Sequence, residues 1–407
     1  MKCRFCQTPL EHEFIDLGAA PPSNAFLTEE QLNMPETFFP LKLFVCHNCF
    51  LVQIDEYKAS EEIFDSDYVY FSSFSSTWLA HARNYADMIT KRLGLNAGSR
   101  VVEVASNDGY LLQYFVEKQI PCLGIEPTEG TAAAAREKGV PVLCEFFGES
   151  LAKDLKAQGK QADLLLGNNV LAHVPDINDF VEGLKIALKD SGTITMEFPH
   201  LMQLVAQNQF DTIYHEHFSY LSFYTVREIF KAHGLVLYDV EELPTHGGSL
   251  RIYAGHEGAG RPISENVEKL LAREESEGMR TLEYYTRLPK AAENIKLDLL
   301  EFLVQAKKQG KKVAAYGAAA KGNTLLNFCG VKSDLIAFAA DASPYKQGKH
   351  LPASHIPVAA PSFIQEEKPD YLIVLPWNLA AEIMEQEKGI QAWGGRFVLP
   401  IPQVKVV

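Results

Sequence analysis

Short apolar runs alternate with stretches of helical periodicity along most of the chain, and this alternation constrains the fold more than any other feature. Strands that alternate with helices form a parallel sheet with crossover helices on its faces. We therefore expect an α/β core. Its predicted strands lie at residues 100–105, 122–126, 162–167 and 192–197, with a closing strand at 249–253.

The same pattern restarts near the end of the sequence. Apolar runs at 312–316, 335–339 and 371–375 predict the strands of a second, smaller Rossmann-type unit. A chain of 407 residues has room for two or three domains. We expect a small N-terminal domain at 1–65, the main α/β domain at 66–260, charge-rich connecting helices at 261–308 and a C-terminal domain at 309–407.

Four of the seven cysteines form two Cys-x-x-Cys pairs, Cys3 with Cys6 and Cys46 with Cys49. Each pair places two sulfur atoms near one point, and two pairs supply the four thiolates of a tetrahedral Zn²⁺ site. A bound metal ion would stabilise a segment of this size, which has little apolar core. Four cysteines leave no open coordination position, so the predicted zinc is structural. The alternative is two pairs of redox-active or free thiols.

Charge and hydropathy exclude several classes of function. The chain carries 38 Lys and Arg against 52 Asp and Glu, a net charge of −14, which argues against nucleic-acid partners and against anionic membrane surfaces. No segment reaches the roughly eighteen apolar residues of a membrane-spanning helix, and the N-terminus lacks the apolar core of a signal peptide. Together with the odd number of cysteines, these features predict a cytoplasmic protein.

The segment after the first strand of the main domain has the features of a site for S-adenosylmethionine. An acidic residue, Glu103, lies on that strand, and residues 105–109 form a tight turn that leads into a helix. The turn lacks the glycine pattern that binding of a dinucleotide pyrophosphate requires. The predicted contacts of the methyl donor in this segment are Glu103, Ser106, Asn107, Asp108 and Gly109.

The ends of the next two strands support the same prediction. Glu126 ends the second strand, where a carboxylate can accept hydrogen bonds from both ribose hydroxyls. Asn168 belongs to the loop after the third strand, at the carboxyl edge of the sheet where ligands bind. Either acidic residue alone could be a solvated charge at a strand end. The three features in order predict a methyl-donor site.

A cluster of ionisable and aromatic side chains follows the strand predicted at 192–197. Residues 214–220 carry Tyr214, His215, Glu216, His217 and Tyr220. Three interpretations compete: the two histidines bind a catalytic metal, they are ordinary polar packing, or one of them is a general base that Glu216 and a tyrosine orient. We favour the base, because histidine titrates near neutrality.

Taken together, these motifs resemble the nucleotide-sugar C-methyltransferases over essentially the whole chain. The resemblance rests on the two cysteine pairs and on residues 68–73 with 78–81, 103–109, 214–217 and 316–324. It implies a class I methyltransferase core of Rossmann-like fold, an N-terminal zinc domain and a C-terminal Rossmann-like domain that contacts the substrate. It also implies S-adenosylmethionine-dependent methylation at C3 of a nucleotide-linked 4-keto-deoxyhexose, with dTDP as the expected nucleotide.

The resemblance also assigns roles to individual residues. His217 is implied as the base that removes the C3 proton, with Tyr214 and Glu216 in the pocket beside it. Tyr68, with Tyr70 as second choice, is implied as another tyrosine of that pocket. The other implied substrate contacts are His173, Lys321 and Asn323, the last two to the diphosphate. Residues 341–348 match the family pattern without an assignable role.

Three other functions fit parts of the pattern. An O-methyltransferase acting on a sugar or related small molecule would use the same donor site, with a base that deprotonates a hydroxyl. A zinc-ribbon binding protein would keep the cysteines without catalysis, and an NAD-dependent oxidoreductase would use the degenerate loop at 317–322. The sequence leaves the sugar and the stereochemical course open. We expect a monomer or a weak homo-oligomer.

Overall fold

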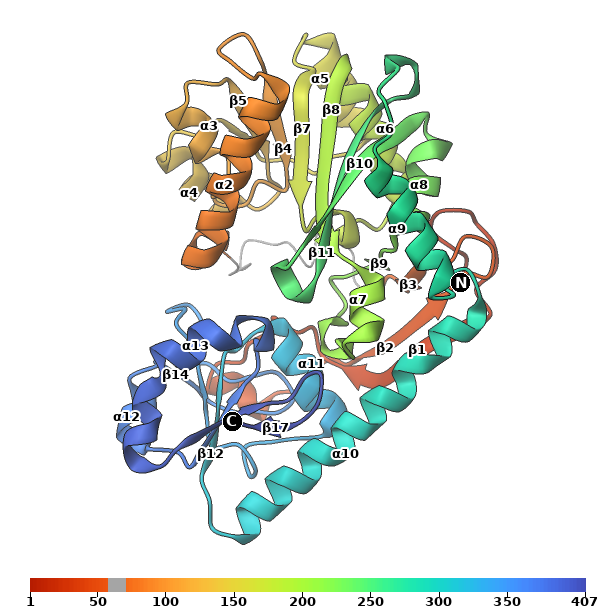
Figure 1. Cartoon of the computed structure of the whole chain (residues 1–407). Coiled ribbons are helices and arrows are strands. Elements are labelled where there is room, and N and C mark those ends of the chain that lie inside the picture. The colour runs from red at the N-terminus through yellow and green to blue at the C-terminus, as the bar shows by residue number, and fades with distance from the viewer. Residues whose placement is uncertain (58–70) are drawn as a thin grey trace.

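The computed structural model describes residues 1–57 and 71–407, so Tyr68 and Tyr70 lie outside the described residues. Figure 1 shows an upper part and a lower part that a long helix joins along one side. The upper part is built on a seven-stranded sheet, the lower part on a six-stranded sheet, and a four-stranded sheet lies beside the junction.

The seven-stranded sheet has the order β10-β11-β8-β7-β4-β5-β6, and β11 is the strand that runs antiparallel to both neighbours. The strand order reverses between β4 and β7, which creates a crevice at the carboxyl ends of these strands. The predicted α/β core is confirmed. The strands are β4 (Val101–Val104), β5 (Cys122–Ile125), β6 (Val142–Leu143), β7 (Ala162–Asn168), β8 (Leu188–Pro199), β10 (Leu235–Leu243) and β11 (Ser249–His256).

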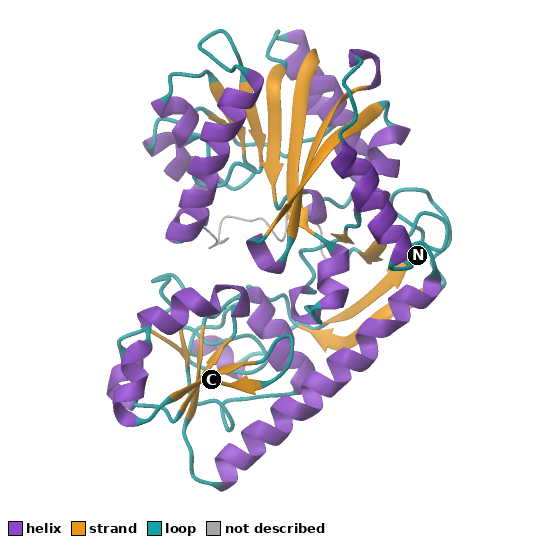
Figure 2. Ribbon diagram, in the orientation of Figure 1, coloured by secondary structure: helices purple, strands orange, loops and turns teal. Residues whose placement is uncertain are grey.

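Helices cover both faces of this sheet (Figure 2), so β4 is buried along its whole length. Ser75 caps the first of these helices by accepting from the backbone N–H of Trp78, and Gly94 ends it in a left-handed conformation. Asp176 caps α6 in the same way. The helices are α2 (Ser76–Leu93), α3 (Gln113–Glu117), α4 (Glu129–Glu137), α5 (Glu149–Ala157), α6 (Ile177–Ala187) and α8 (Phe223–Ala232).

The N-terminal sheet has the order β1-β2-β3-β9 and draws its last strand from a distant part of the chain. β1 (His12–Ala20), β2 (Phe39–Val45) and β3 (Val52–Ile54) come from the N-terminal segment. β9 (Ser219–Tyr220) follows His217 by two residues and pairs with β3 in antiparallel fashion. The sheet next to the cysteine pairs therefore anchors the segment that carries the candidate base.

The lower sheet has the order β14-β13-β12-β15-β16-β17, and its order reverses between β12 and β15. The strand predicted at 335–339 is wrong in extent, because only Ala339 and Ala340 pair with both neighbouring strands. The elements are β12 (Val313–Tyr316), α11 (Ala320–Cys329), β13 (Ala339–Ala340), β14 (Val358–Ala359), α12 (Phe363–Glu367), β15 (Tyr371–Val374), α13 (Ala380–Gln386), β16 (Arg396–Leu399) and β17 (Lys405–Val406).

The connecting helices are α9 (Glu265–Ser276) and α10 (Arg287–Lys308), together with the short α7 (Leu201–Ala206) before the His-Glu-His segment. One apolar core runs from β1 and β2 through α10 to the lower sheet. Tyr285 lies within it, edge-on to Phe14 and stacked on Phe50. None of the described helices is long and apolar enough to cross a membrane.

Candidate active site

The sulfur atoms of Cys3, Cys6, Cys46 and Cys49 all lie within 4.8 Å of one another. The Sγ atoms of Cys3 and Cys49 are 3.5 Å apart, as are those of Cys6 and Cys46. Four thiolates bound to zinc at 2.3 Å would be separated by about 3.8 Å along each edge of a tetrahedron. The residues therefore fit a closed, structural Zn²⁺ site, as predicted.

The two cysteine pairs have the same backbone geometry. The N–H of Gln7 donates to the carbonyl of Cys3, and the N–H of Phe50 donates to that of Cys46, each at 2.9 Å. Gln7 and Phe50 both adopt left-handed φ angles, near 61° and 60°. In addition, the side-chain amide of Gln53 donates to Cys3 Sγ at 3.2 Å. Such outer contacts orient metal ligands.

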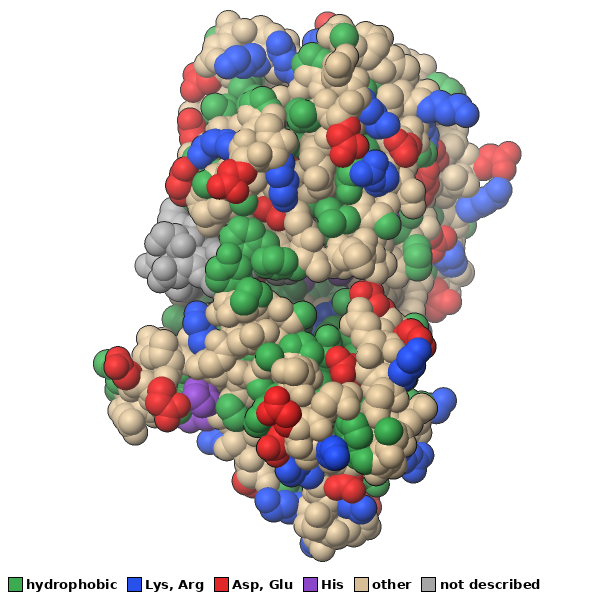
Figure 3. All heavy atoms as spheres, turned by 90° about the vertical axis from the view of Figure 1, so that its left-hand side faces the viewer, with side chains coloured by type: hydrophobic (Ala, Val, Ile, Leu, Met, Phe, Trp, Pro, Cys, Tyr) green, Lys and Arg blue, Asp and Glu red, His purple; other side chains and the backbone are tan. Residues whose placement is uncertain are grey.

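A cavity of about 420 Å³ lies between the upper and lower parts. Residues that follow β4, β5 and β7 line it from above, and residues that follow β12 and β15 line it from below. The carboxyl ends of two sheets, each at its point of reversal, thus face one space. The space-filling view shows a groove at this level with hydrophobic side chains along it (Figure 3).

Glu126 forms the donor side of the cavity. Its Oε2 accepts from the backbone N–H of Asn107 at 2.9 Å, and its Oε1 accepts from that of Thr128 at 3.1 Å. Burial raises the pKa of Glu126. Apolar side chains of Ile125, Pro127 and Phe147 line the cavity beside it. A carboxylate with apolar neighbours suits a ribose joined to an adenine ring.

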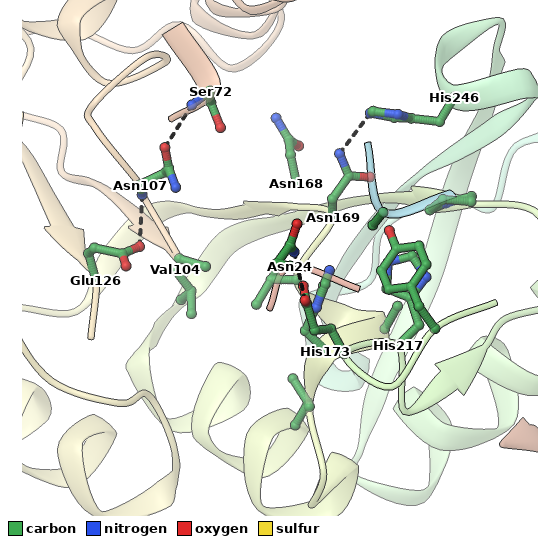
Figure 4. A pocket seen from close by; sticks show the side chains of 18 of the residues that line it. Asn24, Ser72, Val104, Asn107, Glu126, Asn168, Asn169, His173, His217 and His246 are labelled. Atoms are coloured by element: carbon green, nitrogen blue, oxygen red, sulfur yellow. Dashed lines mark hydrogen bonds between the residues drawn. The ribbon is translucent and has the colours of Figure 1, made fainter. Parts of the chain in front are cut away.

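The turn after β4 lines the cavity in a backbone conformation that its sequence does not predict. Ala105 and Asn107 have left-handed φ angles of 55° and 49°, which non-glycine residues rarely adopt. Asn107 is fixed on both sides, because its N–H donates to Glu126 and its Oδ1 accepts from the N–H of Ser72 (Figure 4). Asn168 also lines the cavity and donates to the Tyr110 hydroxyl.

Four of the residues predicted to bind the donor do not line the cavity. Glu103 is fully buried behind the turn, and burial raises its pKa well above the usual value. Asp108 accepts from Lys138 Nζ at 3.1 Å, and Ser106 is fully buried with its Oγ directed toward the backbone of Gly124. Gly109 has a φ of 73°, which side chains rarely adopt, and a Cβ there would lie only 3.1 Å from side-chain atoms of Ala135 and Val140. These residues shape the turn from behind.

Replacing Glu126 with glutamine should weaken the binding of S-adenosylmethionine by about 10–100-fold, because hydrogen bonds to a charged group contribute roughly 1.5–3 kcal/mol. Isothermal titration calorimetry measures the dissociation constant. The matched control is Glu129→Gln, since Glu129 lies exposed on α4 and pairs with Arg136. An unchanged affinity in Glu126→Gln would contradict the assignment of this side of the cavity to the donor.

His217 lies on the opposite side of the same cavity and is only 9% exposed (Figure 4). Its Nδ1 donates to the carbonyl oxygen of Thr212 at 3.0 Å, so the lone pair of the neutral ring is on Nε2. Burial, with the neighbouring His173 as a second cause, holds the pKa of His217 well below its usual value. Burial therefore favours the neutral form of the ring.

The other predicted residues of this cluster gather around His217. The rings of Tyr214 and His217 have centroids 4.0 Å apart, and the ring of His173 meets His217 edge-on at 4.6 Å. Burial lowers the pKa of His173 to about 4. Glu216 is buried, lines the cavity and accepts from the side chain of Asn24. Tyr68 and Tyr70 remain predictions because they lie outside the described residues.

The arrangement does not support a metal held by His215 and His217. His215 turns away from the cavity and contacts the carbonyl oxygen of Pro40 at 3.2 Å. Among the residues that the structure describes, the four cysteines are the group of three or more ligand side chains that could hold a metal ion. His215 is thus a packing residue, and His217 is the histidine of the pair that faces the cavity.

Lys321 enters the cavity from below, at the start of α11. Its Nζ donates to Asn378 Oδ1 at 2.7 Å and lies 4.8 Å above the ring of Trp377. Among the described residues, no carboxylate lies within ion-pair distance of it. Burial lowers the pKa of Lys321. By contrast, Asn323 does not line the cavity; its Nδ2 donates to the carbonyl oxygen of Ser23 at 2.6 Å.

Residues 341–348 acquire a role that the sequence did not suggest. Asp341 accepts from the N–H of Ala318 at 2.7 Å and from that of Ser343 at 2.8 Å. It therefore holds the turn that leads into α11. Lys346 of the same stretch lines the cavity and donates to the carbonyl oxygen of Ala318 at 3.0 Å. The stretch thus shapes the lower wall.

Several polar residues of the cavity were not predicted from the sequence. His246 and Asn169 both have left-handed φ angles, of 53° and 55°. His246 Nε2 lies 3.0 Å from Asn169 Nδ2 (Figure 4). The ring of Trp78 lies against His246, with centroids 5.1 Å apart. Their place in the sequence could have indicated them, because each of these residues follows a strand or lies in a turn next to one. The missed residues are Asn24, Asn169, His246, Lys346 and Asn378.

Comparison with known proteins identifies the family. Three family models match in succession: a zinc binding domain at residues 3–64, a methyltransferase domain at 78–240 and a C-methyltransferase C-terminal domain at 244–402. C-methyltransferase NovU from Streptomyces niveus is 34% identical over 406 residues, which cover 100% of this chain and 96% of that protein. The chain belongs to the C-methyltransferase family. This C-methyltransferase uses S-adenosylmethionine, so the predicted reaction class and donor are confirmed.

Solved structures resemble a smaller part of the C-methyltransferase. The PH0226 protein from Pyrococcus horikoshii OT3 aligns over 46% of this chain and 95% of its own, with 14% identity and a TM-score of 0.37. Magnesium protoporphyrin IX methyltransferase from Synechocystis PCC 6803 aligns over 43% of this chain and 81% of its own, with 14% identity and a TM-score of 0.34. The family match favours carbon rather than a hydroxyl oxygen as the methyl acceptor.

Proposed function

We propose that this C-methyltransferase methylates C3 of a nucleotide-linked 4-keto-deoxyhexose, with dTDP as the nucleotide. One observation carries the proposal: the ring of His217, whose Nε2 has no hydrogen-bond partner among residues 1–57 and 71–407, shares one cavity with the donor-side carboxylate of Glu126 and with the side chain of Lys321. This arrangement offers a base, a methyl-donor site and a cation for a phosphorylated substrate within a single space.

A carbon atom needs activation before it can accept a methyl group. A keto group at C4 acidifies the neighbouring C3–H, because the resulting anion is delocalised onto the keto oxygen. In this proposal His217 removes the proton at Nε2, since its Nδ1–H is engaged by the carbonyl oxygen of Thr212. General-base assistance of this kind contributes about 10²–10⁴-fold to the rate. Bound S-adenosylmethionine supplies an electrophilic methyl group that a carbanion can accept.

The enolate oxygen needs a hydrogen-bond donor while negative charge develops on it. Tyr214 lines the cavity with its ring centroid 4.0 Å from that of His217, so its hydroxyl is one candidate donor. Tyr68 is the other candidate. A donor placed in a water-excluded site stabilises such a charge by roughly 3 kcal/mol.

The lower wall of the cavity suits a diphosphate. Lys321 is a half-buried lysine whose described contacts are the neutral Asn378 amide and the Trp377 ring. Ala319 and Ala320, at the N-terminal end of the ten-residue helix α11, line the cavity beside it. Helix N-termini and ammonium groups both favour phosphate oxygens. The cavity volume lies within the range of small-molecule sites, about 300–1,000 Å³.

Replacing Lys321 with methionine should raise KM for the nucleotide sugar by about 10–100-fold, because a charge-assisted contact to phosphate is lost. The affinity for S-adenosylmethionine should stay unchanged. Steady-state kinetics with varied sugar nucleotide measures the effect. Lys332→Met is the control, since Lys332 is exposed beyond the end of α11. A normal KM in Lys321→Met would remove the diphosphate from this wall.

The proposed function is tested by supplying the enzyme with S-adenosylmethionine and a panel of nucleotide-linked 4-keto-deoxyhexoses. Mass spectrometry detects the methylated product, and NMR distinguishes a methyl group on carbon from one on oxygen. We expect methylation at C3 of at least one dTDP-linked sugar. Methylation of a hydroxyl, or of no member of the panel, would overturn the proposal.

A further inference from the structure

A loop of the N-terminal segment reaches into the active-site cavity. The chain leaves β1 at Ala20, passes through residues 21–26 and places Asn24 on the cavity wall. There Asn24 Nδ2 donates to Glu216 Oε1 at 2.7 Å, across a separation of 192 residues in sequence (Figure 4). The zinc-binding segment therefore supplies a side chain to the site.

The loop is fixed from several directions. Asn323 Nδ2 donates to the Ser23 carbonyl oxygen at 2.6 Å, and both residues are buried. Within the loop, the N–H of Phe26 donates to the carbonyl oxygen of Asn24 at 2.9 Å. Beside it, Thr324 Oγ1 donates to the carbonyl oxygen of Ile213, which ties α11 to the segment that carries Glu216. The backbone on both sides of the Asn24 side chain is thus held by hydrogen bonds.

Glu216 needs such a partner because of its surroundings. The residue is only 6% exposed, and a carboxylate at this degree of burial is costly unless donors satisfy its oxygens. Asn24 is a neutral donor, so it orients the carboxylate without cancelling its charge. The rings of His173 and His217 lie in the same cavity wall.

We propose that Asn24 is a positioning residue for catalysis, which holds the Glu216 side chain toward the substrate. Through Asn24, the zinc-binding segment contributes to the active site. The proposal rests on the proposed function in one respect, the placement of Glu216 on the substrate side of the cavity. It also gives Asn323 a function as the support of the loop rather than a contact of the diphosphate.

The catalytic part of the proposal is tested with Asn24→Ala. We expect kcat to fall by about 10–100-fold, as for loss of a hydrogen bond to a charged group, while KM for S-adenosylmethionine stays unchanged. The assay uses whichever acceptor of the panel the wild-type enzyme methylates. Asn33→Ala is the matched control, because Asn33 is an exposed asparagine of the same segment. A wild-type kcat in Asn24→Ala, or an equal rise in both KM values, would overturn the positioning role.

The contact itself is tested without any turnover by a double-mutant cycle. Asn24→Asp places two carboxylates opposite each other and should lower Tm by about 2–4 °C, as for a loss near 1 kcal/mol in a large domain. In the Glu216→Gln background, the same change should have little effect, since the amide can donate to the new carboxylate. An equal fall in Tm in both backgrounds would overturn the proposal. If no keto sugar of the panel were methylated, the proposed substrate would be wrong. The double-mutant cycle would still test the contact between Asn24 and Glu216, because it requires no turnover.

Discussion

Replacing His217 with asparagine should lower kcat by about 10²–10⁴-fold, the contribution expected of a general base. Asparagine retains a donor for the carbonyl oxygen of Thr212 but has no basic nitrogen to place at the position of Nε2. The affinity for S-adenosylmethionine should be unchanged, because Glu126 and Asn107 lie on the other side of the cavity. Turnover and donor binding measured on the same preparation check both parts.

The neighbouring histidine provides a matched control. His215 contacts the carbonyl oxygen of Pro40 and packs edge-on against Phe39, away from the cavity. His215→Asn should therefore retain far more activity than His217→Asn. If both variants lost activity equally and the enzyme required a second metal ion, the pair would act as metal ligands, and the base mechanism would be wrong.

Loss of the zinc ion should produce the second large effect. Zinc binding contributes about 10–16 kcal/mol in small zinc-dependent folds, which is comparable to the entire stability of an ordinary domain. Replacing Cys46 with serine removes one of four ligands that lie within 4.8 Å of one another. We expect the bound zinc to be lost and Tm to fall by more than about 10 °C. Elemental analysis and calorimetry measure the two quantities.

Zinc loss should also reduce methylation, for a reason specific to this fold. The N-terminal sheet pairs through β3 with β9, two residues beyond His217, and the loop after β1 carries Asn24 to Glu216. Cys122→Ser is the control, because Cys122 lies on β5 and is not one of the four cysteines of the zinc site. An enzyme that lost its zinc from Cys46→Ser yet kept its Tm and turnover would contradict this coupling.

Much of the fold could be predicted from local patterns. The apolar runs at 101–104 and 162–168 are buried strands flanked by helices, and such runs carry their own signal. The two cysteine pairs were equally clear, because their spacing follows from the chemistry of a four-ligand site. The predicted extent of the strand at 335–339 was wrong, because an apolar run alone does not show which residues pair with a neighbouring strand.

The candidate site was less predictable, since tertiary contacts create much of it. Asp108 is acidic and follows a strand, yet Lys138, directly after the end of α4, holds it behind the turn. His246 adopts a left-handed conformation that only the assembled turn and its neighbour Asn169 stabilise. Asn24 lies in a loop whose partner, Glu216, is distant in sequence. Neither the hydrophobic periodicity of the sequence nor the spacing of its motifs predicts such contacts between distant residues.

The central claim is that His217 removes a proton from the carbon that becomes methylated. The most direct measurement is deuterium exchange at C3 of the keto sugar in D₂O, with S-adenosylhomocysteine in place of the methyl donor. We expect the wild-type enzyme to introduce deuterium at C3 and His217→Asn to do so far more slowly. Equal exchange rates in the two proteins, or C3 methylation without any loss of the C3 proton, would contradict it.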